Sequence, residues 1–142
     1  MTVEPSILAG TKEESEYIRR RLIEFNAKKV PAHLASRYEE INLAVKDEEG
    51  RVVGGMLAVL CWNWIEVDIL WVHESLRGMG FGSRLLQRIE VIAKEKACTF
   101  VKLNTFSFQA PEFYRKNGYA EIAVIDGAPL GSRHYFFKKE IG

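Results

Sequence analysis

The sequence contains few cysteines and almost no net charge. Its two cysteines, Cys61 and Cys98, are too few for the disulfide framework of a small secreted protein. Both stand in apolar stretches, where buried and unreactive thiols are expected. The 20 basic and 19 acidic residues leave a net charge of +1, which argues against a broad phosphate-facing surface. We therefore expect no nucleic-acid partner, and at most a small basic patch.

Long apolar runs are also missing. No stretch approaches the 18 or so apolar residues of a membrane-spanning helix. The first residues, Met-Thr-Val-Glu-Pro, lack the basic region and apolar run of a signal peptide. We therefore expect a cytoplasmic protein with no membrane partner. His33 and His134 have no partners at metal-ligand spacing, so no metal site is predicted.

The composition that remains is that of an ordinary globular protein, 47% apolar and 27% charged. The chain has 142 residues, close to the usual size of one domain. Internal repeats, low-complexity tracts and linkers are absent from the sequence. We therefore predict a single domain over residues 1–142.

The first part of the chain combines one helix with two strands. Thr11 and Glu14 have the spacing of a capping box, and apolar residues recur behind them at helical spacing, which predicts a helix over roughly 12–28. Alternation from Tyr38 to Val45 predicts a half-buried strand, closed by a turn at 47–50. In the apolar strand over 51–61, the pair Gly54-Gly55 indicates a bulge or a close approach of another backbone.

The rest of the chain alternates strands with helices. The pattern predicts strands over 64–73, 99–105, 119–126 and 132–139, a helix from the glycine-rich turn to about Ala97, and a short helix over 111–117. This order predicts an α/β domain with a mixed sheet.

The glycine-rich turn at 76–82 joins a strand to a helix, which is a common arrangement for binding an anion. It lacks the P-loop pattern, and Ser83 stands where the dinucleotide pattern needs its last glycine. A generic nucleotide-binding protein is therefore disfavoured. The pattern that fits is Arg/Gln-x-x-Gly-x-Gly/Ala, with Arg77, Gly80 and Gly82.

A second motif follows in the segment 110–119, Ala-Pro-Glu-Phe-Tyr-Arg-Lys-Asn-Gly-Tyr. With the glycine-rich turn it resembles the GNAT superfamily of N-acetyltransferases, which has both motifs in this order and separation. The resemblance covers roughly 38–139, the first helix also fits, and the block 105–114 resembles a small stand-alone bacterial subgroup. It implies a mostly antiparallel central sheet with flanking helices. It also implies that the sheet is splayed between the family's fourth strand, here 64–73, and its fifth.

The resemblance implies acetyl-coenzyme A as co-substrate, with its pyrophosphate on the glycine-rich turn and its acetyl and pantetheine groups beside the strand before it. Many family members carry an asparagine where Ser107 stands, so we expect a polar contact from Asn104 or Ser107. The cofactor-binding residues expected from the resemblance are Trp71, Val72, His73, Arg77, Gly78, Met79, Gly80, Phe81, Gly82, Ser83, Asn104, Ser107 and Ala110.

Acetyl transfer to an amine requires a neutral amine, a donor for the oxyanion and an acid for the departing thiolate. The resemblance assigns the acid to Tyr114, for which a packing role is the alternative. Glu66 and Asp68 are the base candidates. Strand alternation puts both on one face with Leu70 and Val72, and charged residues on such a face are expected to line a wet cleft. The alternative is that either is a solvated edge residue or a salt-bridge partner. Whether either takes the proton or only attracts a cationic amine stays open.

We therefore expect an N-acetyltransferase that moves an acetyl group to a primary amine of a small molecule or peptide, by direct attack in a ternary complex. The alternative is a non-catalytic acyl-coenzyme A sensor or interaction module. Acid and base candidates together favour the enzyme. The resemblance also allows a homodimer. We expect acceptor specificity to reside in 28–40, 64–70 and 126–134.

Overall fold

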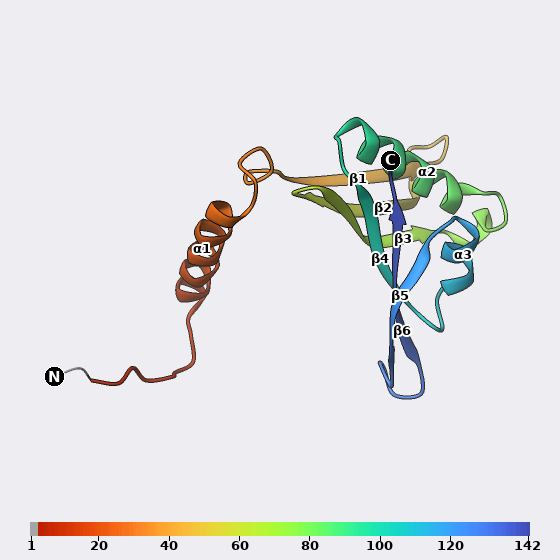
Figure 1. Cartoon of the computed structure of the whole chain (residues 1–142). Coiled ribbons are helices and arrows are strands. Elements are labelled where there is room, and N and C mark those ends of the chain that lie inside the picture. Colours follow the sequence, from red (N-terminus) through yellow and green to blue (C-terminus); the bar gives the residue numbers. More distant parts are fainter. Residues whose placement is uncertain (1–2) are drawn as a thin grey trace. The chain divides into compact units, whose positions relative to one another are not determined.

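The computed structural model describes residues 3–142, shown in Figure 1. The chain divides into two compact units, Met1–Ser36 and Arg37–Gly142. The single domain expected over 1–142 stays a prediction.

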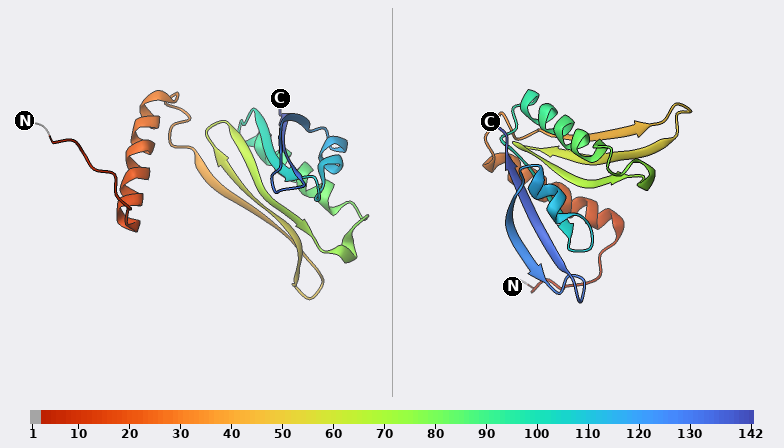
Figure 2. Two further views of the ribbon diagram at one scale, coloured as in Figure 1. Left: turned by 90° about the horizontal axis from the view of Figure 1, so that it is seen from below. Right: turned by 90° about the vertical axis from the view of Figure 1, so that its right-hand side faces the viewer.

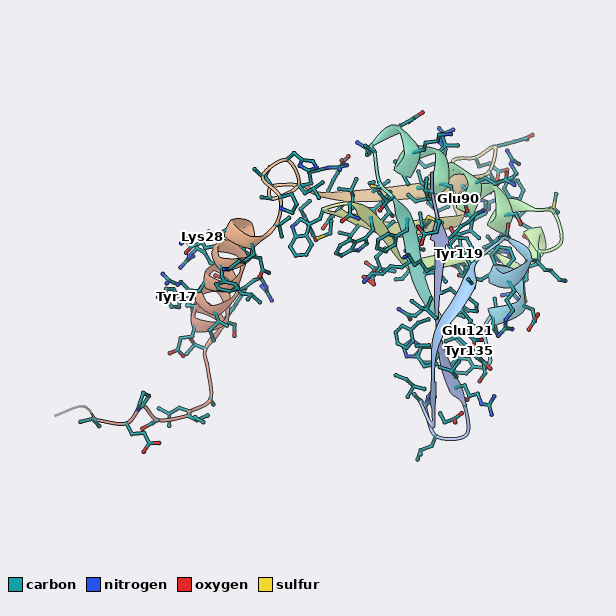
Figure 3. All side chains as sticks on the ribbon, in the orientation of Figure 1. Tyr17, Lys28, Glu90, Tyr119, Glu121 and Tyr135 are labelled. Carbon is teal, nitrogen blue, oxygen red and sulfur yellow. The ribbon has the colours of Figure 1, made fainter. Side chains whose placement is uncertain are left out.

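The first unit contains one helix, α1 (Lys12–Lys29), which begins with the predicted capping box. The Thr11 hydroxyl accepts a hydrogen bond from the Glu14 amide at 3.1 Å, and the Glu14 carboxylate accepts one from the Thr11 amide at 2.8 Å. The hydrogen bond from the Thr11 amide, followed by the interaction of the carboxylate with the Thr11 side chain, lowers the pKa of Glu14. Tyr17 and Lys28 project from this helix in Figure 3. The predicted helix is confirmed.

The second unit is built on a mixed sheet, and Figure 1 labels its strands. Their order across the sheet is β1-β2-β3-β4-β6-β5, and every neighbouring pair is antiparallel except β3 and β4. The predicted fold class is therefore confirmed. The strands are β1 (Tyr38–Lys46), β2 (Val52–Cys61), β3 (Trp64–Val72), β4 (Phe100–Phe106), β5 (Ala120–Asp126) and β6 (Arg133–Glu140).

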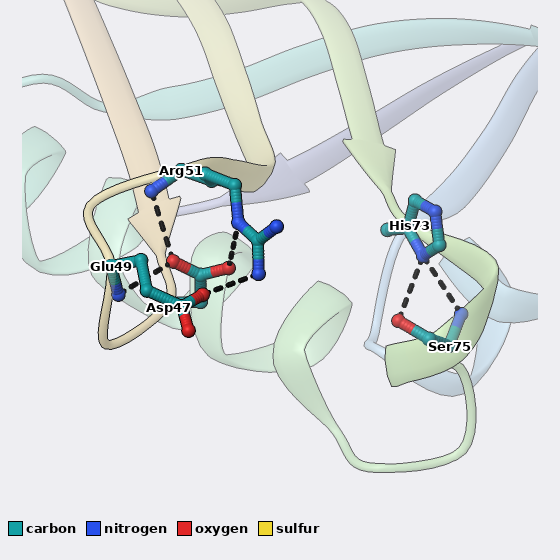
Figure 4. A network of polar contacts seen from close by, with 5 residues as sticks. All are labelled: Asp47, Glu49, Arg51, His73 and Ser75. Atoms are coloured by element: carbon teal, nitrogen blue, oxygen red, sulfur yellow. Dashed lines mark hydrogen bonds and ion pairs between the residues drawn. The ribbon is translucent and has the colours of Figure 1, made fainter.

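The β1–β2 hairpin is closed by one carboxylate. Asp47 accepts hydrogen bonds from the amides of Glu49 and Arg51, both at 2.9 Å, and pairs with the Arg51 side chain (Figure 4). Above the turn the two strands lie very close, since a Cβ built on Gly55 would stand 2.5 Å from the carbonyl oxygen of Leu43. The close approach predicted for the glycine pair is confirmed.

The core lies between the sheet and helix α2 (Phe81–Glu95), which covers one face of the sheet in Figure 2. The apolar side of α2 is buried, and it packs with side chains from β2, β3, β4 and β6. Burial of this apolar surface is the main force that holds α2 on the sheet. The fully buried large side chains are Met56, Ile65, Leu86, Ile89, Val101 and Phe137.

The sheet splits between β3 and β4. These parallel strands pair only over 64–67 and 100–103, although β3 continues to Val72 and β4 to Phe106. The connection between them runs through the short 3-10 helix η1 (Glu74–Leu76), the glycine-rich turn and α2. The two carboxyl-terminal halves therefore diverge, which confirms the predicted splay.

A β-bulge interrupts β3 at the start of this divergence. The consecutive β2 residues Leu57 and Ala58 pair with Ile69 and Val67, so Asp68 is an extra residue without a partner on β2. An extra residue reverses the alternation of side chains beyond it.

The bulge overturns one sequence-based expectation, that Glu66, Asp68, Leu70 and Val72 share a face. Leu70 and Val72 pack against the core. Glu66 lies on the opposite side of the sheet, beside Lys102. The expectation is wrong because strict alternation assumes regular pairing, and the pairing shifts at Asp68.

The last part of the second unit is tied to α2 by a polar cluster around Glu90, labelled with Tyr119 in Figure 3. The Tyr119 hydroxyl donates to Glu90 at 3.0 Å, and the Lys139 ammonium donates to the same carboxylate at 2.9 Å. Tyr119 follows the short helix α3 (Pro111–Lys116). This cluster therefore fixes the end of the second motif against α2.

The two cysteines and the lengths of the helices also agree with the sequence. Cys98 is buried and Cys61 half-buried, and burial raises the pKa of both thiols, as expected for unreactive cysteines. No helix within residues 3–142 has the length and apolar character needed to cross a membrane.

Candidate active site

A cleft of about 920 Å³ opens where β3 and β4 diverge. Its walls come from the end of β3, the glycine-rich turn, the start of α2, the turn after β4 and the first residues of α3. The splay thus brings together the two motifs, which lie about 30 residues apart in the sequence.

Most of the site residues expected from the sequence line this cleft. They are Asp68, Trp71, Val72, Arg77, Gly78, Gly80, Phe81, Gly82, Ser83, Ala110 and Tyr114. The expected residues that do not line it are Glu66, His73, Met79, Asn104 and Ser107. The cleft also contains residues that were not expected, namely Ile69, Leu70, Leu76, Thr105, Phe108, Gln109 and Phe113.

The glycine-rich turn presents backbone to the cleft. Gly78 and Gly80 have φ angles of +81° and +82°, a left-handed conformation that favours glycine. Gly80 caps α2 without a side-chain hydrogen bond, so the first amides of the helix have no cap partner. Amides at a helix N-terminus, with the positive end of its dipole, suit a phosphate.

Gly82 has a second, steric role. A Cβ built there would stand 2.9 Å from Cζ of Phe113, so a side chain at this position displaces the Phe113 ring. Gly82 lies in α2, and Phe113 lies in α3 beside Tyr114. The absence of a side chain at Gly82 therefore lets the two motifs pack against each other.

Tyr114 is a buried residue with its ring in the core and an edge on the cleft. Its side chain is 7% exposed, and its ring lies near Phe113, Tyr119 and Phe137. Burial raises the pKa of Tyr114 to about 12. The phenol therefore keeps its proton at neutral pH, as a general acid requires. Among residues 3–142, no fully buried side-chain oxygen lacks a hydrogen-bond partner.

The two carboxylate candidates are in different surroundings. Asp68 is exposed at the bulge and lines the cleft. Glu66 is half-buried on the other face of β3, where its carboxylate lies 3.9 Å from the Lys102 ammonium. Only Asp68 therefore has direct access to a molecule in the cleft.

His73 stabilises the turn that follows β3. Its Nδ1 accepts a hydrogen bond from the Ser75 amide at 3.1 Å and lies 2.7 Å from the Ser75 hydroxyl, as Figure 4 shows. Its own amide donates to the Val53 carbonyl on β2 at 2.8 Å. Because alternate amides of a strand point to opposite edges, the amide of Val72 points away from β2, toward the splay.

Asn104 and Ser107 make their contacts with β6. Asn104 Oδ1 lies 2.9 Å from His134 Nε2, and the Ser107 hydroxyl accepts a hydrogen bond from the Arg133 amide at 3.0 Å. Their contact with a cofactor stays a prediction.

Thr105 and Gln109 were not predicted as site residues. The Thr105 hydroxyl donates to the Gln109 side-chain oxygen at 3.1 Å, and that oxygen also accepts a hydrogen bond from the Phe106 amide at 2.9 Å. These bonds hold the turn between β4 and α3, which carries Phe108 and Ala110 on the cleft wall. In the sequence, only their position directly before the second motif indicated that they could belong to the site.

Comparisons with known proteins match this chain to acetyltransferases. The acetyltransferase (GNAT) family model matches residues 10–119. Blasticidin-S acetyltransferase of Streptomyces morookaense is 40% identical over 95 residues, which are 66% of this chain and 70% of that protein. The crystal structure of an acetyltransferase from Bacillus cereus is 43% identical and has a TM-score of 0.91, covering 96% of this chain and 97% of that one.

A more distant structural neighbour was solved with acetyl coenzyme A bound. This protein from Bacillus anthracis is 19% identical with a TM-score of 0.65, and the match covers 80% of this chain and 69% of that one. At this identity the match supports the fold.

Proposed function

The chain belongs to the GNAT family of acetyltransferases, and we propose that it transfers the acetyl group of acetyl-coenzyme A to a primary amine by direct attack in a ternary complex. The observation that carries the proposal is the cleft at the splay. This cleft is lined by the glycine-rich turn, by Tyr114, whose phenol is protonated at neutral pH, and by the exposed carboxylate of Asp68.

The residues of the cleft fit acetyl-coenzyme A. The backbone at 78–83 would hold the pyrophosphate, because the φ angles of Gly78 and Gly80 and the start of α2 leave amides free to donate. Arg77, also on the cleft wall, adds a positive charge. The splayed halves of β3 and β4 leave room for the extended pantetheine arm. When bound, this co-substrate supplies an activated thioester.

Tyr114 is the proposed acid. Its phenol stays protonated far above neutral pH, and it lines the cleft from the side of α3. It therefore gives its proton to the departing sulfur. The Val72 amide, pointing into the splay, is the proposed hydrogen-bond donor to the acetyl oxygen, since the next amide is already bonded to β2.

Asp68 is the proposed partner of the amine. An alkylamine is mostly protonated at neutral pH, and an exposed carboxylate in the cleft attracts that cation and accepts a proton from it, directly or through water. Glu66 is assigned a supporting role, because Lys102 balances its charge on the other side of the strand. The bulge at Asp68 is the reason that the two carboxylates have different surroundings.

The acceptor is proposed to be a small molecule, as the name blasticidin-S acetyltransferase indicates for the relative from Streptomyces morookaense. A thiol-release assay with acetyl-coenzyme A tests this across blasticidin S, aminoglycosides, polyamines, amino acids and short peptides. We expect thiol release with at least one amine, and an acetylated amine in the mass spectrum. Tight binding of acetyl-coenzyme A without acetylation of any amine would instead support the non-catalytic module.

A further inference from the structure

Three rings form a column beside the cleft, on the sheet face opposite α2. Phe106 is the middle ring. It is stacked on Phe108, with centroids 5.4 Å apart and planes 3° apart, and on His134, with centroids 4.3 Å apart and planes 21° apart. Phe106 and His134 are cross-strand partners on β4 and β6. The column is therefore built by the sheet register and continues into the turn that carries Phe108.

His134 is fixed at the inner end of the column. Its Nε2 lies 2.9 Å from Asn104 Oδ1, and its ring also lies against Phe136, with centroids 4.3 Å apart. The hydrogen bond and the neighbouring ring hold the imidazole in place. Phe106 stacks on this fixed imidazole on one side and on Phe108 on the other, so its ring is also held in place.

Phe108 is the outer end of the column, and it is open. Its side chain is 64% exposed, and it lines the cleft. Phe106 is the one aromatic ring among the described residues that stacks on it. A large exposed aromatic ring on a supported column costs little conformational entropy to use in binding, because its orientation is already set.

A second aromatic pair on the same sheet face provides a comparison. Trp64 and Phe100 stack with centroids 5.6 Å apart at the other end of β3 and β4. Ammonium groups cover this pair, since Lys102 lies 5.2 Å from the Trp64 ring and Lys138 lies 4.5 Å from the Phe100 ring. In the described part of the chain, no lysine or arginine lies over Phe108.

We propose that Phe108 is a stacking platform for the acceptor, and that the preferred acceptor is an amine carrying a planar aromatic or heteroaromatic ring. This inference rests on the proposed function, because the same cleft must receive the amine. Offset stacking on Phe108 would hold the ring at the cleft wall while the amine reaches Asp68 on the wall formed by β3.

The experiment compares two amines of similar size that differ in planarity, 2-phenylethylamine and 2-cyclohexylethylamine. Dissociation constants are measured by NMR titration of the protein saturated with coenzyme A, which cannot turn over. The catalytic efficiency, kcat/KM, is measured separately by thiol release from acetyl-coenzyme A. Burial of apolar area does not favour the phenyl ring over the cyclohexyl ring, so a preference for the planar amine reports stacking.

Phe108→Leu is the test variant and Phe100→Leu is the matched control, since Phe100 stacks on the same sheet face but lines no part of the cleft. We expect the wild-type protein to bind the planar amine about tenfold more tightly. This ratio should fall to about one in Phe108→Leu and persist in Phe100→Leu. The two amines differ in basicity. Comparing the ratio of their dissociation constants between the wild-type protein and each variant removes this difference.

Three results would overturn the inference. One is equal binding of the two amines by the wild-type protein, and another is a preference that survives in Phe108→Leu. The third comes from light scattering: a wild-type dimer that Phe108→Leu converts to a monomer would show that this face is an interface between copies. The outcomes separate the two proposals. A planar preference in binding with no acetylation of these amines or of any amine in the panel refutes only the proposed function. Equal acetylation of both amines refutes only the stacking platform.

Discussion

Replacing Tyr114 by phenylalanine separates a catalytic hydroxyl from a packing ring. The ring lies in the core against Phe113, Tyr119 and Phe137, and phenylalanine keeps all of that contact area. We therefore expect Tyr114→Phe to fold and to bind acetyl-coenzyme A with nearly unchanged affinity. Loss of a general acid lowers kcat by about 10²–10⁴-fold. Calorimetry gives the affinity, and single-turnover thiol release gives the rate.

The same substitution changes the dependence of stability on pH. The pKa of Tyr114 is about 12 in the folded protein, against 10.0 for an ordinary tyrosine. Because the folded pKa is raised, its contribution to stability is complete below pH 10 and is lost as the pH rises through 12. Between pH 8 and pH 11 this group removes about 1.4 kcal/mol from the free energy of unfolding. Between pH 8 and pH 11 the free energy of unfolding of Tyr114→Phe should therefore fall by about 1.4 kcal/mol less than that of the wild-type protein.

Denaturant unfolding at pH 8 and pH 11 measures this difference, and the other tyrosines cancel between the two proteins. The assignment of Tyr114 as the acid would be refuted if the variant kept wild-type single-turnover rates. It would also be refuted if the variant lost cofactor affinity or stability at neutral pH while the bound complex still reacted, since that result describes a packing residue.

Four other substitutions test the site and the contacts that support it. Gly82→Val should weaken acetyl-coenzyme A binding because its side chain displaces Phe113 from the cleft wall, and unchanged affinity by calorimetry would contradict the loop assignment. Asp68→Asn should lower kcat/KM at least tenfold more than Glu66→Gln, and equal effects across pH would contradict the assignment of Asp68. Glu90→Ala should lower the free energy of unfolding by about 2 kcal/mol, because it leaves a phenol and an ammonium without their shared carboxylate; an unchanged denaturation midpoint would contradict this.

Local features of the chain were predictable from the sequence because their causes are local. The start of α1 follows from a capping box between residues three apart. The close approach at Gly55 follows from glycine inside an apolar strand. The splay, by contrast, was predicted from the resemblance to a family. Nothing in the residues of β3 and β4 alone shows that the two strands pair over only four positions.

The column of rings depends on long-range pairing. Phe106 and His134 are cross-strand partners although they lie 28 positions apart in the chain. From the sequence, His134 was tested as a metal ligand and fell within the 126–134 range expected to set acceptor specificity. Its partner across the sheet could not be predicted, because the register of the strands is not visible in the sequence. Phe108 likewise has no distinguishing pattern in the sequence. Its importance comes from the ring on which it is stacked and from the cleft that it lines.

The separation of the two carboxylates was missed for a related reason. Glu66 and Asp68 stand two residues apart, and regular alternation would place both on one face with the same solvent and the same substrate. Asp68 has no partner on β2, and at this bulge it lines the cleft, whereas Glu66 lies beside Lys102. The position of such a bulge depends on how the two strands pair along their whole length. The bulge changes the side-chain direction at the position where the proposed reaction needs a carboxylate. The chemistry assigned to this strand therefore depends on its irregularity.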